Sequence, residues 1–96
     1  MQYRLIIQPK AKKTIKELER TNPKKLKRVN KTLGQMEAGL EAPGLNPHPY
    51  KGWKTDDGYQ VFEVYVENKT PGAYRIFWFY GSGRKEITIL EITPHP

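Results

Sequence analysis

The side chains best suited to proton transfer in this sequence are its two histidines, His48 and His95. Imidazole has an ordinary pKa of about 6.5, so near neutral pH one ring can accept a proton while another donates one. The planar guanidinium of Arg75, which lies between aromatic residues, could bind two oxygen atoms of a phosphate. Lys51 and Lys54 follow His48 closely and could add positive charge beside that anion. These residue types suit acid–base chemistry at a phosphodiester.

The net charge of the chain also favours an anionic partner. Seventeen Lys and Arg residues oppose ten Asp and Glu residues, which gives a formal net charge of +7. This balance attracts polyanions over long range and favours binding through counterion release, so nucleic acid is the leading class of partner. The positive charge is concentrated between residues 10 and 31, which could form a second contact surface or simply a solvated helix face.

Length and composition exclude several other classes. With 96 residues, of which 36% are hydrophobic, residues 1–96 are expected to form a single domain. The absence of cysteine excludes disulfides and thiolate metal sites, and two separated histidines without clustered carboxylates make a poor metal set. The N-terminal apolar stretch is too short for a signal peptide or a membrane span, so we expect a cytoplasmic location.

Two amphipathic helices are expected in the first half of the chain. Apolar residues recur at helical spacing from Pro9 to about Arg20. Asn22 followed by Pro23 is an N-cap and first-turn signature for a second helix, which Gly39 is expected to end. Neither helix would be stable alone, so the two should form a hairpin that packs its apolar face on another layer. The apolar positions of the second helix are Leu26, Val29, Leu33, Met36 and Leu40.

The remaining regular segments favour β-structure. A short run at residues 3–7 precedes the helices, and longer runs cover about 59–67, 73–80 and 86–93. Both faces of the 73–80 run carry aromatic side chains, so this strand should be central. Residues 41–58 are rich in Pro, Gly, Asn and Asp and are expected to form a loop. The expected fold is α+β in the order βααβββ, a small antiparallel sheet with a two-helix hairpin packed on one face.

This order of elements, together with three motifs, resembles the RelE/ParE toxin superfamily over nearly the whole chain. The motifs are Pro47-His48-Pro49-Tyr50-Lys51-Gly52, Tyr74-Arg75-Ile76-Phe77-Trp78 and the terminal Thr93-Pro94-His95. They are more similar to the ribosome-dependent RNases of the RelE, YoeB and HigB type than to the gyrase-inhibiting ParE type. The resemblance implies a toxin of a type II toxin–antitoxin module. Such a toxin cuts messenger RNA on the ribosome without metal or small-molecule cofactor and is restrained by a cognate antitoxin.

The resemblance also implies roles for individual residues. His48 lies where relatives keep a Glu or His as general base, and Lys51 matches the adjacent residue that contacts phosphate. Arg75 falls on the strand arginine that relatives use at the scissile phosphate, and His95 resembles the C-terminal general acid. Many relatives close with an aromatic residue after or in place of that histidine, whereas Pro96 follows here.

Metal-free RNA cleavage would match these roles. The RNA 2′-hydroxyl attacks the neighbouring phosphorus, so a base must take its proton, an acid must protonate the leaving 5′-oxygen and cations must stabilise the phosphorane. Tyr50 and Trp53 could stack on unpaired bases or simply anchor the loop. Glu63 could orient one of the cations, although a plain ion pair is the favoured interpretation.

Three alternatives remain open from the residues alone. A ParE-like protein would bind DNA gyrase and cut no RNA, although binding alone needs no histidines. A non-catalytic module could bind RNA or DNA through the lysine-rich hairpin, but the Asn22-Pro23 junction does not resemble the glycine-containing turn of a helix-turn-helix. A metal hydrolase is disfavoured by the poor metal set.

Overall fold

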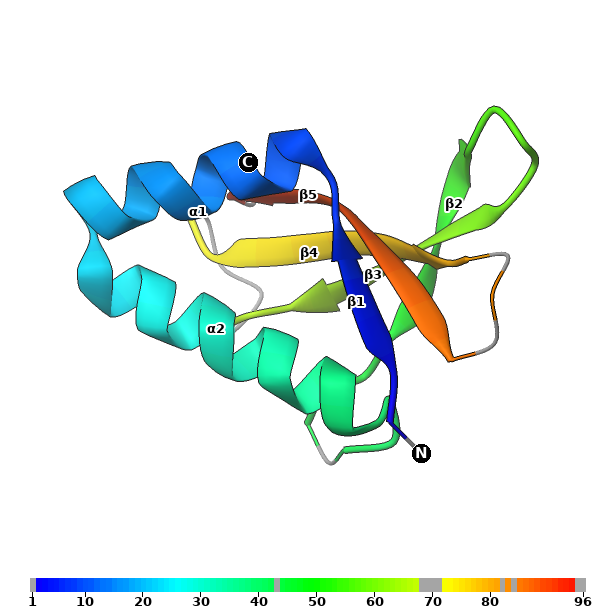
Figure 1. Ribbon diagram of the computed structural model, residues 1–96, viewed down its shortest axis with the longest axis horizontal. Coiled ribbons are helices and arrows are strands. Elements are labelled where there is room, and N and C mark those ends of the chain that lie inside the picture. The colour runs from blue at the N-terminus through cyan, green and yellow to red at the C-terminus, as the bar shows by residue number, and fades with distance from the viewer. Residues whose placement is uncertain (1, 43, 68–71, 82, 84, 95–96) are drawn as a thin grey trace.

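The computed structural model describes residues 2–42, 44–67, 72–81, 83 and 85–94 (Figure 1). Within these residues, the chain forms two helices and a five-stranded mixed sheet, which confirms the predicted α+β class. In chain order the elements are β1 (Arg4–Ile7), α1 (Pro9–Thr21), α2 (Pro23–Ala38), β2 (His48–Lys54), β3 (Gln60–Tyr65), β4 (Tyr74–Tyr80) and β5 (Glu86–Pro94).

The sheet has the strand order β1-β5-β4-β3-β2. The strands β2 to β5 form an antiparallel meander, and β4 has a neighbour on each side, as its two aromatic faces predicted. The edge strand β1 instead pairs with β5 in parallel, with Arg4 opposite Glu86. The expectation of a wholly antiparallel sheet was therefore wrong. The connection between these two parallel strands runs through both helices and the strands β2 to β4, which is long enough for a parallel pair.

The second correction concerns residues 48–54, which form the edge strand β2 rather than part of a loop. An edge strand tolerates Pro49, because a missing N–H on the unpaired side breaks no ladder bond. Its pairing with β3 shifts register between Pro49 and Lys54, and Gly52 within this interval has a φ of +84°. The breakers that predicted a loop are thus accommodated in an irregular strand.

The helices begin and end where their local signals indicated. The side chain of Asn22 accepts a hydrogen bond of 3.2 Å from the backbone N–H of Lys25 and caps α2. At the other end, Gly39 follows Ala38 as the C-cap, and its N–H donates to the carbonyl of Gln35. Among the described residues, neither helix has the length and apolar character needed to cross a membrane.

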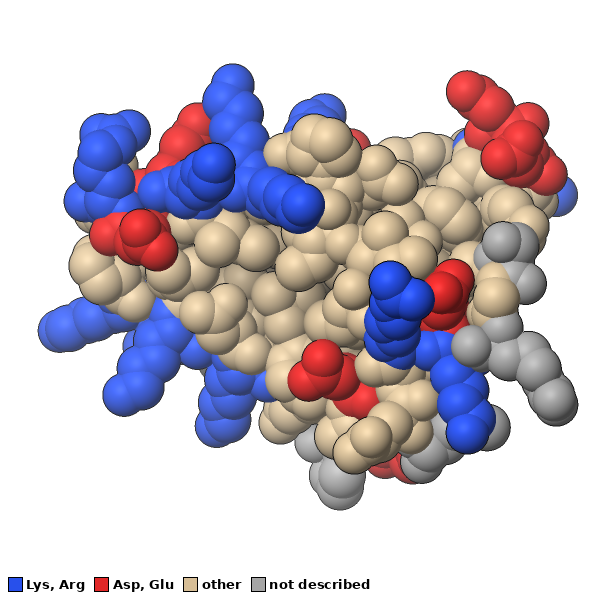
Figure 2. Space-filling view, viewed as in Figure 1, with Lys and Arg blue, Asp and Glu red and all other residues tan. Residues whose placement is uncertain are grey.

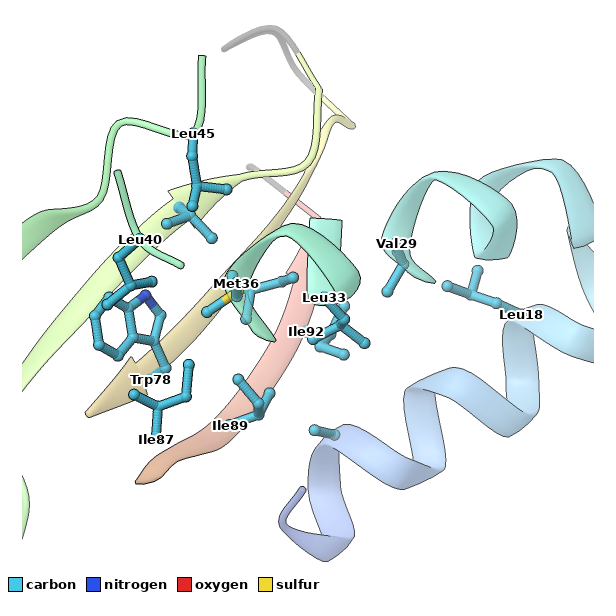
Figure 3. Close-up of a cluster of buried hydrophobic side chains, with 13 residues drawn as sticks. Leu18, Val29, Leu33, Met36, Leu40, Leu45, Trp78, Ile87, Ile89 and Ile92 are labelled. Atoms are coloured by element: carbon cyan, nitrogen blue, oxygen red, sulfur yellow. The ribbon is translucent and has the colours of Figure 1, made fainter. Parts of the chain in front are cut away.

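The main core fills the space between the helical hairpin and one face of the sheet (Figure 3). Met36 and Trp78 have no exposed surface, and burial of such large apolar side chains contributes about 1.5 to 3 kcal/mol each. Four of the five apolar positions predicted for α2 and its end are buried, whereas Leu26 is only partly buried. The buried members of the core are Ala11, Leu18, Val29, Leu33, Met36, Leu40, Leu45, Val64, Ile76, Trp78, Ile87, Ile89 and Ile92.

An ionic cluster joins the first half of α2 to the segment that follows β3. Lys25 and Arg28 each donate to the carboxylate of Glu67, and the backbone N–H of Tyr74 donates to it at 3.3 Å. The bond from Lys25 does most to lower the pKa of Glu67 below its ordinary 4.5, with further lowering by Arg28 and Tyr74 against the effect of burial. A carboxyl whose pKa folding lowers stabilises the folded state above its unfolded pKa. This contribution is lost as the pH falls from 4.5 through the lowered folded value.

Replacing Glu67 with glutamine should therefore destabilise the protein at neutral pH but much less in acid. We expect a loss of about 1.5 to 3 kcal/mol at pH 7, the usual contribution of a hydrogen bond to a charged group. Urea unfolding at pH 7 and pH 3 measures the difference, with Glu19→Gln on the exposed surface of α1 as the control. Equal losses for Glu67→Gln at both pH values would exclude the ionised carboxylate as the source.

Candidate active site

A small aromatic cluster covers part of the sheet face opposite the helices. On β4, Ile76 and Trp78 belong to the main core, so Phe77 between them points to the other face. The rings of Tyr50 and Trp53 from β2 each lie 5.0 Å from the ring of Phe77, centroid to centroid. Phe77 is therefore buried although it lies outside the main core. This cluster attaches the irregular strand β2 to the centre of the sheet.

Beside the cluster, one carboxylate joins two of the predicted site residues. Glu63 on β3 lies opposite His48 on β2 in the strand register. Its Oε1 is 2.9 Å from His48 Nε2, and its Oε2 accepts a hydrogen bond of 2.9 Å from Arg75 Nη1. The ion pair between Glu63 and a cation of the site is therefore confirmed, with Arg75 as the partner. The contact with His48 was not predicted.

The imidazole of His48 has acceptor atoms at both ring nitrogens. Nδ1 lies 3.0 Å from the carbonyl oxygen of Asn46, and Nε2 faces the Glu63 carboxylate. The ring of Tyr65 lies 5.8 Å away, tilted by 31°. The His48 side chain nevertheless keeps 44% of its surface exposed, so it can reach a ligand from solution.

The guanidinium of Arg75 is held by one ion pair and two aromatic rings. Its central carbon lies 4.8 Å from the ring centroid of Phe77 and 5.8 Å from that of Tyr50. A cation placed above the face of an aromatic ring is attracted to it electrostatically. The side chain is 14% exposed, and its buried Nε has no hydrogen-bond partner in the described part of the chain. Arg75 is thus fixed in place while its donors are not fully used.

The other predicted site residues that the structure describes all lie on β2, the strand that begins with His48. Tyr50 and Trp53 anchor β2, as one of the two interpretations held, yet Tyr50 remains 36% exposed. Lys51 and Lys54 are exposed on the same strand. His95, the predicted general acid, lies outside the described residues.

Positive charge gathers over the helical hairpin rather than at this cluster. Figure 2 shows Lys and Arg side chains projecting from the region of α1 and α2, with a few acidic side chains among them. The basic residues of the two helices are Lys10, Lys12, Lys13, Lys16, Arg20, Lys24, Lys25, Lys27, Arg28 and Lys31. The basic segment identified in the sequence therefore lies on the helical hairpin, with one group of basic side chains along α1 and another along α2.

Comparison with known proteins shows the fold. No protein-family model matches the chain, and no curated protein matches its sequence. Among solved structures, a YoeB/ParE toxin from Agrobacterium tumefaciens matches with a TM-score of 0.72 at 13% identity, over 97% of this chain and 99% of that one.

Two structures from Staphylococcus aureus agree with this match over 100% of both chains. One is a YoeB dimer, with a TM-score of 0.69 and 14% identity. The other is a heterotetrameric YoeB-YefM toxin–antitoxin complex, with a TM-score of 0.66 and 16% identity. The chain therefore has the fold of these YoeB/ParE and YoeB toxin structures, which agrees with the fold that the resemblance predicted.

Proposed function

We propose that this chain is the toxin of a toxin–antitoxin module and that it cuts messenger RNA on the ribosome. The observation that carries the proposal is the juxtaposition of His48 and Arg75, which approach each other through Glu63 from separate strands. The sequence motifs that resemble the RNase toxins supply these same two residues. The YoeB-like fold supports the proposal independently of the motifs.

The proposed division of roles follows from what each group can do. Arg75 binds the scissile phosphate with the donors that Glu63 leaves unused, and this fixed positive charge stabilises the phosphorane. His48 transfers a proton next to it; the resemblance assigns it the general base and His95 the general acid. Lys51 and Lys54 bind flanking phosphates as exposed point charges.

Aromatic contacts complete the proposed RNA site. The exposed part of Tyr50 lies beside Arg75, where it can stack on an unpaired base. Trp53 supports Tyr50 at a centroid distance of 6.2 Å. Base–aromatic stacking contributes about 1 to 3 kcal/mol per base and tolerates any sequence, so it aids binding without fixing which codon is cut.

The proposed partner that restrains this site is an acidic or amphipathic antitoxin acting in the cytoplasm. The YoeB-YefM complex provides the precedent for a partner chain on this fold. Carboxylates of such a partner would cover some of Lys51, Lys54 and Arg75, because complementary charge favours that association. A co-purifying neighbouring gene product that restores growth would identify it.

Ribosomes programmed with a defined message provide the decisive test. We expect the purified chain to break the message, to leave a 2′,3′-cyclic phosphate and to remain active in EDTA, because the 2′-hydroxyl is the nucleophile. Primer extension locates the breaks, and the same message without ribosomes tests whether the ribosome is required. Growth arrest with intact RNA and impaired DNA supercoiling would instead favour the gyrase-binding alternative.

A further inference from the structure

Glu63 is a buried carboxylate with two different partners. Its side chain is 3% exposed, and its two oxygens bind His48 and Arg75 separately. Burying a charged carboxylate is costly unless the charge is compensated and its oxygens accept hydrogen bonds. Glu63 meets both conditions in this position, because it pairs with a guanidinium on one side and an imidazole on the other.

The strand register explains how one side chain reaches both partners. Glu63 lies on β3, between β2 and β4, and His48 is directly opposite it. Arg75 is opposite Tyr65, two residues further along β3 on the same face. Diagonal neighbours on one face of a sheet are within reach of long side chains. Glu63 therefore links the edge strand β2 to β4.

A structural ion pair with Arg75 would explain the burial of Glu63 but not the orientation of His48. His48 is substantially exposed and could be solvated by water. Instead, its Nδ1 faces a carbonyl oxygen and its Nε2 faces the carboxylate. Both are acceptors, so a neutral ring, which has one N–H, can donate to only one of them. The charged carboxylate is the stronger acceptor and draws that proton to Nε2.

We propose that Glu63 is a positioning residue that keeps a proton on Nε2 of His48 and holds the ring in a fixed orientation relative to Arg75. This inference rests on the RNase function proposed above and deepens it. While the bond to Glu63 is closed, Nε2 is a proton donor. In this tautomer the unprotonated nitrogen is Nδ1, so His48 accepts the 2′-hydroxyl proton there, once Nδ1 has moved away from the carbonyl oxygen of Asn46.

A double-mutant cycle between Glu63→Gln and His48→Gln tests whether Glu63 acts through His48. Glutamine keeps the size of Glu63, but it has one acceptor oxygen in place of two and lacks the charge that selects Nε2. We expect Glu63→Gln to lower kcat by about 10- to 100-fold in the wild type, as for other residues that orient a catalytic group. In the His48→Gln background the loss should shrink to about threefold or less, because coupled residues are not additive.

Glu91→Gln is the matched control for this cycle. Glu91 on β5 is also partly buried, and its carboxylate pairs with Lys10 at 3.1 Å. The substitution removes the same charge from the same sheet but leaves the contacts of Glu63 with His48 and Arg75 intact, so it should leave kcat unchanged. Thermal unfolding of each variant verifies the fold. Equal losses from Glu63→Gln in both backgrounds would show that Glu63 does not act through His48, which would overturn the proposal.

A second readout does not depend on RNA cleavage. Nitrogen-15 NMR of the histidine rings distinguishes protonated from unprotonated nitrogens, and the His48→Gln spectrum assigns the signals. We expect a proton on Nε2 in the wild type and in Glu91→Gln, and a shift toward the Nδ1 form in Glu63→Gln. An unprotonated Nε2 in the wild type would refute the proposed hydrogen bond from His48 to Glu63, even if the protein is an active RNase. A protonated Nε2 in a protein that cuts no RNA would refute the RNase function but support the hydrogen bond from His48 to Glu63.

Discussion

Replacing Arg75 with lysine should lower the rate of RNA cleavage by about 10²- to 10³-fold, the usual loss when one fixed transition-state donor is removed. Lysine keeps the charge that compensates Glu63, so the fold should survive. It lacks the planar fork that binds two phosphate oxygens, and its ammonium cannot reproduce the contacts of the guanidinium with the rings of Phe77 and Tyr50. Single-turnover cleavage on programmed ribosomes measures the effect.

Alanine at position 75 needs a compensating change before its effect can be interpreted. With Arg75 removed, the buried carboxylate of Glu63 keeps only His48, and breaking such a pair from one side costs about 3 to 5 kcal/mol. Loss of toxicity could then follow from unfolding. Arg75→Ala combined with Glu63→Gln removes the uncompensated charge, and its rate is compared with that of Glu63→Gln alone, which itself lowers kcat. If a folded Arg75→Lys protein cut RNA at the wild-type rate, Arg75 would have no role at the phosphate.

Features of the fold that depend on neighbouring residues were predictable from the sequence. The cap at Asn22, the helix start at Pro23 and the stop at Gly39 each act within one helical turn, and all three are confirmed. The central position of β4 followed from aromatic side chains on both of its faces, because an edge strand has less need to bury both. Local signals of this kind do not depend on where the rest of the chain lies.

Features that depend on pairing between distant segments were missed. The direction of β1 is set by its pairing with β5, some 80 residues away, and nothing in the sequence of β1 encodes it. Pro49 and Gly52 correctly indicate an interrupted backbone, but at a sheet edge such residues still belong to a strand. Their tolerance there is a property of the assembled sheet.

In the candidate site, too, the residue types were predictable from the sequence, whereas a contact that depends on strand pairing was not. The residue types at His48 and Arg75 could be selected from the sequence because their chemistry and motifs are visible in it. A charged residue within the otherwise β-favouring run of β3 was also a visible signal, and it correctly suggested an ion pair for Glu63. Its second contact, with His48, requires the irregular β2–β3 register, which no local pattern gives.

Replacing His48 with glutamine should lower the cleavage rate by about 10²- to 10⁴-fold, the range for loss of a positioned proton-transfer group. Glutamine is the informative choice because its amide can still donate a hydrogen bond to Glu63 but cannot gain or lose a proton near neutral pH. The His48 side chain is 44% exposed and contributes little to the core, so the fold should be unaffected. RNA binding should also change much less than the rate, because Arg75 and the lysines remain.

Single-turnover rates and RNA affinities, measured for the same preparations on programmed ribosomes, separate these effects. Lys51→Gln is the matched contrast: it should weaken association and reduce the log–log salt slope by about one unit per lost phosphate contact, with the chemical step largely intact. A His48→Gln rate within a few-fold of the wild type would exclude His48 from proton transfer. Catalysis would then depend on stabilisation of the phosphorane by Arg75, and the role of Glu63 would be to hold the guanidinium of Arg75 in place.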